Sequence, residues 1–285
     1  SRRVVSMQKT DQLPDKALAR RSFEAAAAGY DRAAVLQREV GQRLFERLDL
    51  MKLQPSRVLD LGAGTGQCIP GLFERYRKTE VVALDIALPM LGRARKRGRW
   101  LRRPRCVCGD AEKLPFSDNS FDLVFSNLML QWCVDLQATF VELQRVLRPG
   151  GLLLFSSFGP DTLRELRDSW QSVDAFSHVN AFVDMHDVGD ALVSAGFSDA
   201  VMDVERLTVT YPDVWKLMRE LKQIGAHNVT AGRTRGLTGK AQMQRLLESY
   251  ERYRRDGVLP ASYEIVNGHA WAVSSEISIP VGGIK

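Results

Sequence analysis

The chain has 285 residues, of which 45% are hydrophobic and 26% are charged. These values are typical of a globular protein with one large domain or at most two. No run approaches the roughly 18 apolar residues of a membrane span, and polar sequence rather than an apolar signal core follows Ser1. Cys106 and Cys108 lack a matching second ligand pair, so the four cysteines predict no metal site. We therefore expect a cytoplasmic protein with no membrane contact.

The net charge is positive, because 40 Lys and Arg residues stand against 34 Asp and Glu, a formal charge of +6. Much of the excess lies in one run, GRARKRGRWLRRPR at residues 92–105, which holds eight basic residues and no acid. A single run of this kind is usually a solvated helix face and loop. The alternative is a docking surface for an acidic partner, either a nucleic acid or an acidic protein. Composition alone leaves both interpretations open.

Two N-terminal helices are predicted within residues 14–50. The first runs from Pro14 to about Gly29, and the second, Ala33–Leu48, has apolar residues at four-residue steps. Short β-rich runs then alternate with helical segments, which implies an α/β fold with right-handed crossovers and a parallel sheet covered on both faces. The predicted strands are Arg57–Leu61, Glu80–Asp85, Pro104–Cys108, Phe121–Asn127 and Gly151–Ser157, and the predicted helices are Leu72–Lys78, Leu88–Arg97 and Leu136–Leu147.

The last third of the chain has a different pattern. Val201–Tyr211 alternates as a strand does, and Ser262–Val273 is its predicted partner. Roughly fifty residues separate the two, far more than a median loop of about 4–6, and two amphipathic helix stripes fall among them. The sequence therefore predicts a single domain over residues 1–285, with a core at 55–210 and 262–273 and a small helical cap at 211–261.

The stretch VLDLGAGTGQ, residues 58–67, has the form of a buried strand that runs into three glycines. Glycines at a strand–helix turn let backbone N–H groups approach a ligand. The stretch lacks the Gly-Lys-Ser/Thr of a phosphate loop, and Gln67 stands where a dinucleotide fingerprint needs its third glycine. Asp60 would repel a pyrophosphate but attract a cation such as the amino-acid ammonium of S-adenosylmethionine. A glycine turn that binds no ligand is the alternative.

Polar residues also follow the next three predicted strands. Asp85 ends the second strand 19 residues after Gly66, where an acid can accept both hydroxyls of a ribose. The third strand ends at Asp110, Ala111 and Glu112, which are suited to an adenine amino group and ring edge, and the fourth ends at Asn127. Each acid taken alone is more often a helix cap or a turn residue. Four such strand ends together favour a ligand at the carboxyl edge of the sheet.

Over about Arg57–Ser157 these motifs resemble the class I S-adenosylmethionine-dependent methyltransferases. The resemblance implies a Rossmann-like sheet of seven strands, the last antiparallel, with S-adenosylmethionine as cofactor. Pro70–Gly71 departs from the expected helix after the glycine turn, so this helix should begin near Pro70. The residues that the resemblance implies for cofactor binding are Tyr30, Asp60, Gly62, Ala63, Gly64, Gly66, Asp85, Ile86, Met90, Asp110, Ala111, Glu112, Asn127 and Leu128.

Segments outside Arg57–Ser157 make the resemblance more specific, because they point to one family within this class. From about Pro14 to Ala272 the chain is similar to the malonyl-[acyl-carrier protein] O-methyltransferases of biotin synthesis. This resemblance implies methyl transfer to the free carboxylate of a malonyl thioester, S-adenosylhomocysteine as product, and an acidic acyl carrier protein as partner, with no nucleic acid. The basic runs Arg93–Arg105 and Arg252–Arg255 then become docking candidates. The segments that carry it are Ser22–Asp31, Asn127–Cys133, Ser157–Leu163, His178–Phe182 and Leu221–Ala226.

The acceptor side is predicted from the same resemblance. Tyr30 is expected to close over the methionine end of the cofactor, and Trp132 to form an apolar wall at the acceptor mouth. A carboxylate acceptor is already ionised at neutral pH and needs no general base. Two rival functions stay open, an RNA or protein methyltransferase and a non-methylating assembly factor of the same fold. The candidates for binding the malonyl carboxylate are His178, Lys222, Arg233 and Arg164.

Overall fold

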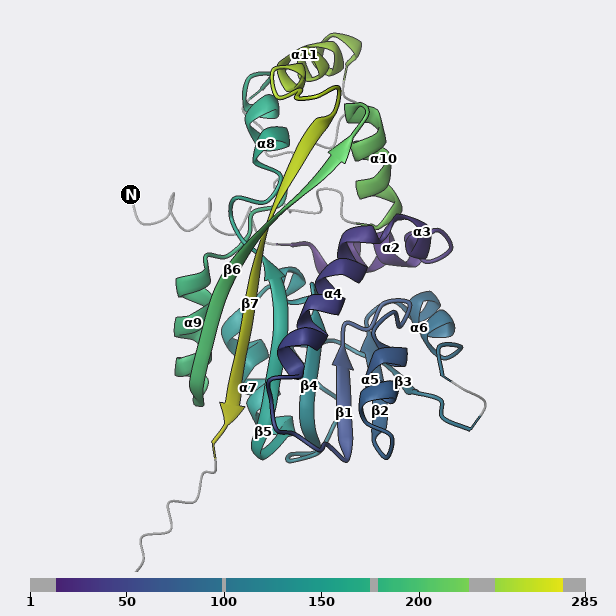
Figure 1. Ribbon diagram of the computed structural model, residues 1–285, viewed down its shortest axis with the longest axis vertical. Coiled ribbons are helices and arrows are strands. Elements are labelled where there is room, and N and C mark those ends of the chain that lie inside the picture. The colour runs from purple at the N-terminus through teal and green to yellow at the C-terminus, as the bar shows by residue number, and fades with distance from the viewer. Residues whose placement is uncertain (1–13, 99–100, 175–178, 226–238, 274–285) are drawn as a thin grey trace, which may run out of the picture.

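The computed structural model describes residues 14–98, 101–174, 179–225 and 239–273 (Figure 1). A seven-stranded sheet with the order β3-β2-β1-β4-β5-β7-β6 forms its centre. The neighbours from β3 to β5 pair in parallel, and β7 is antiparallel to both β5 and β6. This confirms the predicted α/β sheet with an antiparallel last strand. The strands are β1 Arg57–Leu61, β2 Glu80–Asp85, β3 Arg105–Cys108, β4 Phe121–Asn127, β5 Leu147–Phe158, β6 Phe197–Tyr211 and β7 Leu259–Ala272.

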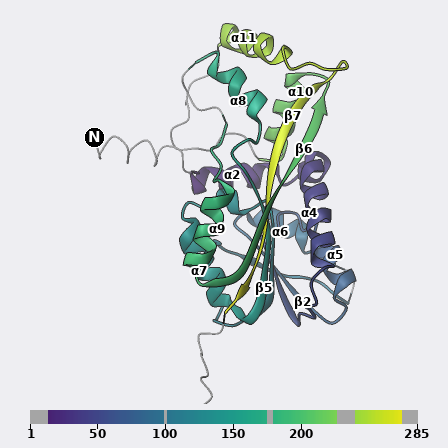
Figure 2. The same ribbon diagram turned by 60° about the vertical axis from the view of Figure 1, so that its left-hand side comes forward.

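Helices cover both faces of the sheet, and Figure 2 shows α7 and α9 on one side of the strands and α4 and α5 on the other. Such double cover explains why the central strands are almost continuously apolar. The described helices are α2 Lys16–Ala26, α3 Tyr30–Ala33, α4 Val35–Leu48, α5 Ile69–Arg75, α6 Leu88–Ala94, the 3-10 turn η1 Leu130–Trp132, α7 Leu136–Val146, α8 Arg164–Gln171, α9 Met185–Ser194, α10 Val214–Gln223 and α11 Lys240–Glu251.

The two N-terminal helices follow the predicted pattern with one difference. The four-residue apolar stripe of α4, Leu36, Val40, Leu44 and Leu48, is buried. The predicted second helix, however, is divided: the single turn α3 precedes α4, and Ala34 between them has a non-helical backbone. This break turns α3 toward the carboxyl edge of the sheet.

The start of α5 confirms the interpretation of Pro70–Gly71. The helix begins at Ile69 and places Pro70 in its first turn, where the missing N–H is tolerated. A Cβ on Gly71 would lie 2.7 Å from the ring of Phe45 in α4. The glycine therefore permits the close approach of the two helices below the glycine-rich turn.

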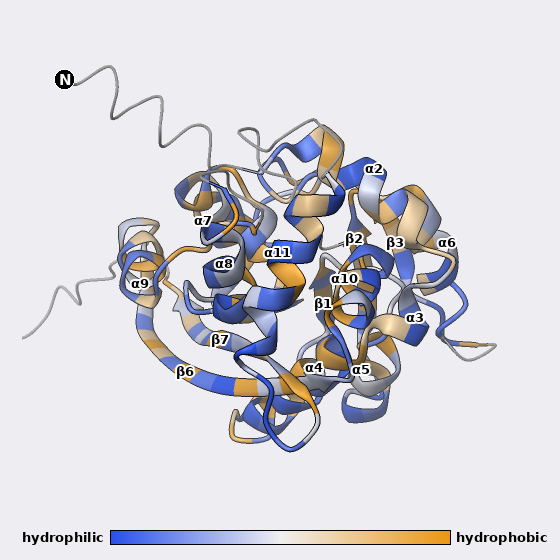
Figure 3. Cartoon of the chain, turned by 90° about the horizontal axis from the view of Figure 1, so that it is seen from above, coloured by the Kyte–Doolittle hydropathy of each residue, from blue (hydrophilic) through white to orange (hydrophobic). Residues whose placement is uncertain are grey.

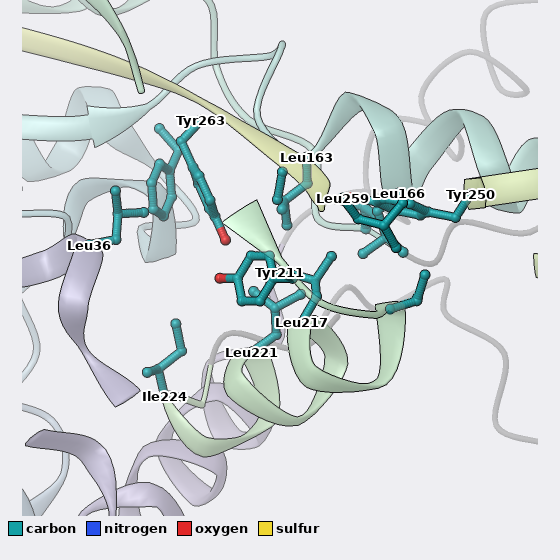
Figure 4. Packing of buried hydrophobic residues seen from close by; sticks show 14 of the residues in the cluster. Leu36, Leu163, Leu166, Tyr211, Leu217, Leu221, Ile224, Tyr250, Leu259 and Tyr263 are labelled. Atoms are coloured by element: carbon teal, nitrogen blue, oxygen red, sulfur yellow. The ribbon is translucent and has the colours of Figure 1, made fainter. Parts of the chain in front are cut away.

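Strands β6 and β7 are longer than predicted, and they extend beyond the rest of the sheet at the end where its carboxyl edge lies (Figure 1). Helices α10 and α11 lie between them in sequence, so the predicted helical cap is present. Seen from above in Figure 3, α8, α10 and α11 lie in front of this edge. Apolar side chains from α4, α8, α10, α11 and β7 form one buried cluster there (Figure 4).

No helix among the described residues is long and apolar enough to cross a bilayer. No group of three or more His, Cys, Asp or Glu side chains within the same ranges is placed to hold a metal ion. Cys106 and Cys108 both lie in β3 with free thiols.

Candidate active site

Four loops that follow parallel strands meet in one cavity at the carboxyl edge of the sheet, which we call the cofactor cavity. The empty space in it, counted together with open solvent at its mouth, is about 940 Å³. Open α/β sheets bind their ligands at this edge. The lining residues from these loops and strand ends are Gly62, Gly64, Leu84, Asp85, Ile86, Gly109, Asp110, Ala111, Asn127, Leu128 and Met129.

The glycine-rich turn after β1 presents backbone to this cavity. Gly62 and Gly64 have φ angles of +72° and +53°, a region that glycine enters without steric cost. A Cβ on Gly62 would lie 2.1 Å from Cγ of Met129, whereas a Cβ on Gly64 would have no atom within 4 Å. The N–H of Gly64 donates to Oδ2 of Asp85 at 2.8 Å. Gly64 therefore borders open space, close to the acid that ends β2.

Ala63 and Gly66 of the same turn lie outside the lining of the cofactor cavity. The N–H of Ala63 donates to the carbonyl of Leu84 at 2.9 Å and so fixes the turn to β2. A Cβ on Gly66 would lie 2.8 Å from Cα of Ala94. The absence of a side chain at Gly66 therefore lets α6 pack against the turn.

Two buried carboxylates lie at and behind the turn. Asp85 accepts the N–H of Ala87 at 2.8 Å as well as that of Gly64, and burial raises the pKa of its carboxyl. Asp60 lies outside the cavity lining, and its Oδ2 atom has no hydrogen-bond partner. Burial, with a smaller contribution from the charge of Asp85, raises the pKa of Asp60 to about 7. A cation bound near the turn would favour the ionised form of Asp60.

Lys16 of α2 joins the N-terminal segment to the loop after β3. Its Nζ lies 2.7 Å from Oδ2 of Asp110 and also pairs with Glu112. Asp110 lines the cofactor cavity, but Glu112 does not. Glu112 instead accepts the backbone N–H groups of Val134 and Asp135. It therefore connects the loops after β3 and β4.

Side chains of α2 and α3 cover the cofactor cavity. Ala19, Phe23 and Tyr30 line it from this side, together with Met90 of α6. The Phe23 ring packs edge-on against Trp132 of η1, with ring centroids 5.1 Å apart. Burial raises the pKa of the Tyr30 hydroxyl, so Tyr30 stays neutral at physiological pH.

Asp31, next to Tyr30, fastens α3 to the glycine-rich turn. Its Oδ1 accepts the Thr65 hydroxyl and the Gln67 amide, the latter at 3.0 Å, and its Oδ2 pairs with Arg97. The Arg97 Nε also donates to the Thr65 carbonyl at 3.0 Å. Burial acts to raise the pKa of Asp31, but the hydrogen bonds and the charge of Arg97 outweigh it, so the pKa is lowered.

A smaller side cavity adjoins the cofactor cavity, with about 430 Å³ of empty space when open solvent is included. The two share Gln37, Trp132, Phe158 and Ile224, so Trp132, which the sequence predicted as a wall of the acceptor mouth, lies on the boundary between the two cavities. The full lining of the side cavity among the described residues is Leu36, Gln37, Trp132, Phe158, Thr162, Leu163, Asn180, Phe182, Glu220, Leu221, Ile224 and Tyr263.

The two basic candidates that the structure describes, Lys222 and Arg164, line neither cavity. Lys222 is exposed on α10, and the Arg164 side chain is 57% exposed beside Glu165. His178 and Arg233 lie outside the described residues. Sequence reasoning in turn missed lining residues that come from helices and from β5, namely Lys16, Phe23, Gln37, Gln131, Phe158 and Ile224.

A family model described as "Methyltransferase domain" matches residues 59–155. With the seven-stranded sheet and the glycine-rich turn, this match defines a class I S-adenosylmethionine-dependent methyltransferase fold. The chain is 54% identical over 270 residues to the malonyl-[acyl-carrier protein] O-methyltransferase of Gallionella capsiferriformans, which covers 93% of each chain. The enzyme of the same name from Halorhodospira halophila is 50% identical and covers 96% of this chain and 97% of the relative. The chain belongs to the malonyl-[acyl-carrier protein] O-methyltransferase family.

Solved structures support the fold. The YcgJ protein of Bacillus subtilis superimposes with a TM-score of 0.59 at 14% identity and covers 81% of this chain and 98% of its own. A phosphoethanolamine N-methyltransferase of Haemonchus contortus, solved in complex with S-adenosyl-L-methionine, gives a TM-score of 0.56 at 20% identity. It covers 88% of this chain and 57% of its own. At such low identities the likeness concerns the fold alone.

Proposed function

We propose that this protein transfers a methyl group from S-adenosylmethionine to the free carboxylate of a malonyl thioester carried by acyl carrier protein, the reaction implied for biotin synthesis. The observation that carries the proposal is a cavity built from strand-end loops suited to the cofactor. A second cavity adjoins it and shares the lining residues Gln37, Trp132, Phe158 and Ile224. The names of relatives about 50% identical over nearly the whole chain support this choice of acceptor.

The residues of the cofactor cavity suit S-adenosylmethionine. The open space beside Gly64 leaves room for close approach to the backbone, and Asp85 is placed to accept ribose hydroxyls. Asp110 and Ala111 suit the adenine edge. Asp60, buried with an unpartnered oxygen, favours the positive ammonium of the methionine end. When bound, the cofactor supplies an electrophilic methyl group on a positively charged sulfur.

Catalysis then depends on positioning rather than on proton transfer. A carboxylate is ionised at neutral pH, so no base has to remove a proton. The described linings of both cavities contain no histidine. Phe23, Tyr30, Trp132 and Phe158 surround the junction and exclude water, which favours alignment of a charged nucleophile with its target. The chain's own contribution is therefore a dry, ordered junction.

For the partner we propose an acidic acyl carrier protein, met by the basic run after α6. Arg93, Arg95 and Arg103 are exposed, whereas Arg97 binds Asp31 and Arg102 donates to the carbonyls of Phe73 and Tyr76. Arg97 and Arg102 therefore have a structural role that neither interpretation of the sequence included, and we propose the exposed arginines for docking. The second basic run, Arg252–Arg255, follows α11 at the far end of the molecule from α6 (Figure 1).

The proposal is tested by measuring methyl transfer from radiolabelled S-adenosylmethionine to malonyl-carrier protein and acetyl-carrier protein side by side. We expect label with malonyl only, because acetyl lacks the free carboxylate. Binding of the cofactor without transfer to malonyl would contradict the proposal. That result would favour an RNA or protein methyltransferase, or a non-methylating assembly factor.

A further inference from the structure

The outward face of α10 is basic. Lys216, Arg219 and Lys222 are exposed on it, and residues three apart are neighbours on a helix surface. Glu220, the only acid within this helix, is directed elsewhere, because its Oε1 accepts the hydroxyl of Tyr211 at 2.8 Å. The three basic residues therefore form a stripe of positive charge that no acid of α10 neutralises.

Other helices of the chain neutralise such side chains locally. In α2, α4 and α7 an arginine pairs with a glutamate three or four positions away. Like charges at this spacing instead destabilise a helix slightly. The stripe on α10 is therefore mildly unfavourable in the free protein, and an acidic partner would remove that repulsion.

Trp215 lies on the same face, four residues before Arg219. Its side chain is 46% exposed, and among the described residues it is the one aromatic that is large, hydrophobic and exposed. The Nε of Arg219 donates to the carbonyl of Trp215 at 3.3 Å, which keeps the two residues together. Tryptophan and arginine are enriched among the residues that dominate protein–protein binding energy. An exposed indole within a basic stripe therefore indicates a protein partner.

The inward face of α10 borders the cavities. Leu221 and Ile224 line the side cavity, and Ile224 also lines the cofactor cavity. The hydroxyl of Ser22 in α2 donates to the carbonyl of Gly225 at 3.1 Å, so the end of α10 is held against a helix that covers the cofactor cavity (Figure 1). A partner on the outward face of α10 would thus be separated from the cavities by a single helix.

We propose that this face, the α10 surface (Trp215, Lys216, Arg219 and Lys222), is where the acidic acyl carrier protein docks. The inference rests on the proposed function and deepens it by naming the contact surface. A tethered acyl group has to enter the site while its carrier stays outside, so the carrier must bind next to the cavities. The exposed arginines of the run after α6 would then attract the partner from a distance, whereas the α10 surface makes the close contact.

The test compares carrier-bound substrate with the same acyl group on a small thiol. One variant combines Lys216→Glu, Arg219→Glu and Lys222→Glu, and a second is Trp215→Ala. With malonyl-carrier protein we expect KM to rise about thirtyfold in the triple variant and about tenfold in Trp215→Ala. With malonyl-pantetheine, which has no protein part, kcat/KM should equal that of the wild type. High salt should reduce the charge effect but not the effect of Trp215→Ala.

A direct binding measurement supports the kinetics. Apo-carrier protein, which lacks the acyl arm, should bind both α10 variants more weakly than it binds the wild type, in titrations followed by calorimetry. The matched control combines Lys52→Glu, Arg77→Glu and Lys78→Glu. These residues are exposed and precede β1 and β2, so they lie at the opposite edge of the sheet. The control changes the net charge equally and should leave carrier binding intact, and every variant should bind S-adenosylmethionine as the wild type does.

Several outcomes would overturn the inference. Unchanged KM and carrier binding in both α10 variants would remove the surface from docking. An equal loss with malonyl-pantetheine would mean damage to the cavities, and an equal loss in the control would reduce the effect to net charge. Binding of a single-stranded RNA oligonucleotide that the α10 variants abolish would assign the surface to a nucleic acid.

In each of these cases the wild-type enzyme still methylates malonyl-carrier protein. If the wild type methylates neither malonyl substrate, the proposed function fails and the inference fails with it.

Discussion

Replacing Asp31 by alanine should weaken cofactor binding, although Asp31 does not line the cofactor cavity. The carboxylate connects α3 with the glycine-rich turn through Thr65, Gln67 and Arg97. Tyr30, the preceding residue, lines the cavity. Without the carboxylate, α3 is no longer held against the turn. Tyr30, which we expect to cover the methionine end of the bound cofactor, then loses its fixed position.

The size of the effect follows from exposure. Hydrogen bonds to a charged group contribute about 1.5–3 kcal/mol each when buried, whereas exposed ion pairs contribute about 0–1 kcal/mol. The side chains of Asp31 and Arg97 are 37% and 34% exposed, so the whole set is worth about 2 kcal/mol. Since about 1.4 kcal/mol is a factor of ten, Asp31→Ala should raise the Kd for S-adenosylmethionine by up to about 30-fold. Because the pKa of Asp31 is lowered, its carboxylate stays ionised at pH values below its ordinary pKa. The contribution is therefore constant near neutral pH and is lost only as the pH falls through the lowered pKa.

The assay is isothermal titration of S-adenosylmethionine together with thermal unfolding. Asp49→Ala is the matched control, because Asp49 pairs with Arg75 between α4 and α5 and lies outside the cavity linings. Both variants should lower the unfolding temperature, but only Asp31→Ala should weaken cofactor binding. Equal affinities in the two variants would show that Asp31 stabilises the fold without holding the cover.

Three further variants test the rest of the site. Lys16→Met breaks the pairing with Asp110 and should raise the Kd for S-adenosylmethionine a few-fold, measured by the same titration; an unchanged value would separate α2 from cofactor binding. Because the pKa of Asp60 is raised to about 7, affinity for the positively charged cofactor should fall by up to about tenfold per pH unit below that value. Asp60→Asn should abolish this pH dependence of the affinity. It should also abolish the release of a proton on cofactor binding, which is measured by titration in buffers of different ionisation enthalpy. A pH dependence that persists in Asp60→Asn would belong to another group. Replacing Arg93, Arg95 and Arg103 together by Glu should raise KM for malonyl-carrier protein, most strongly at low salt, and leave cofactor affinity intact, whereas an unchanged KM would place docking elsewhere.

The sheet was predictable because its signals are local. A buried strand such as Arg57–Leu61 carries its apolar run and its glycine-rich turn within a few residues. The ends of β5, β6 and β7 were less predictable, since pairing rather than composition extends them. Leu147, for example, pairs with Phe121 ahead of a bulge, four residues before the predicted strand.

The cofactor side of the site was also predictable, since parallel strands bring their carboxyl ends to one edge. The helical walls of the two cavities were not, because their residues come from helices far apart in sequence. Lys16 meets Asp110 across 94 positions, and Gln37 looks like an exposed residue of an amphipathic helix. Lys222 was expected at the acceptor, but the buried stripe Val214, Leu217 and Leu221 turns it outward.

Binding of the cofactor and ordering of α2 and α3 over the cofactor cavity are thermodynamically coupled. Asp110 lines the cofactor cavity and also binds Lys16 of α2, and the turn that carries Gly64 also carries Thr65, a partner of Asp31. A cofactor that orders these loops therefore favours closure of α2 and α3, and closure favours the cofactor by the same free energy. Phe23 of the closed cover packs against Trp132, which borders the side cavity. A bound cofactor that holds α2 would therefore also hold the ring that packs on Trp132. We expect the acceptor to bind more tightly after S-adenosylmethionine than before it.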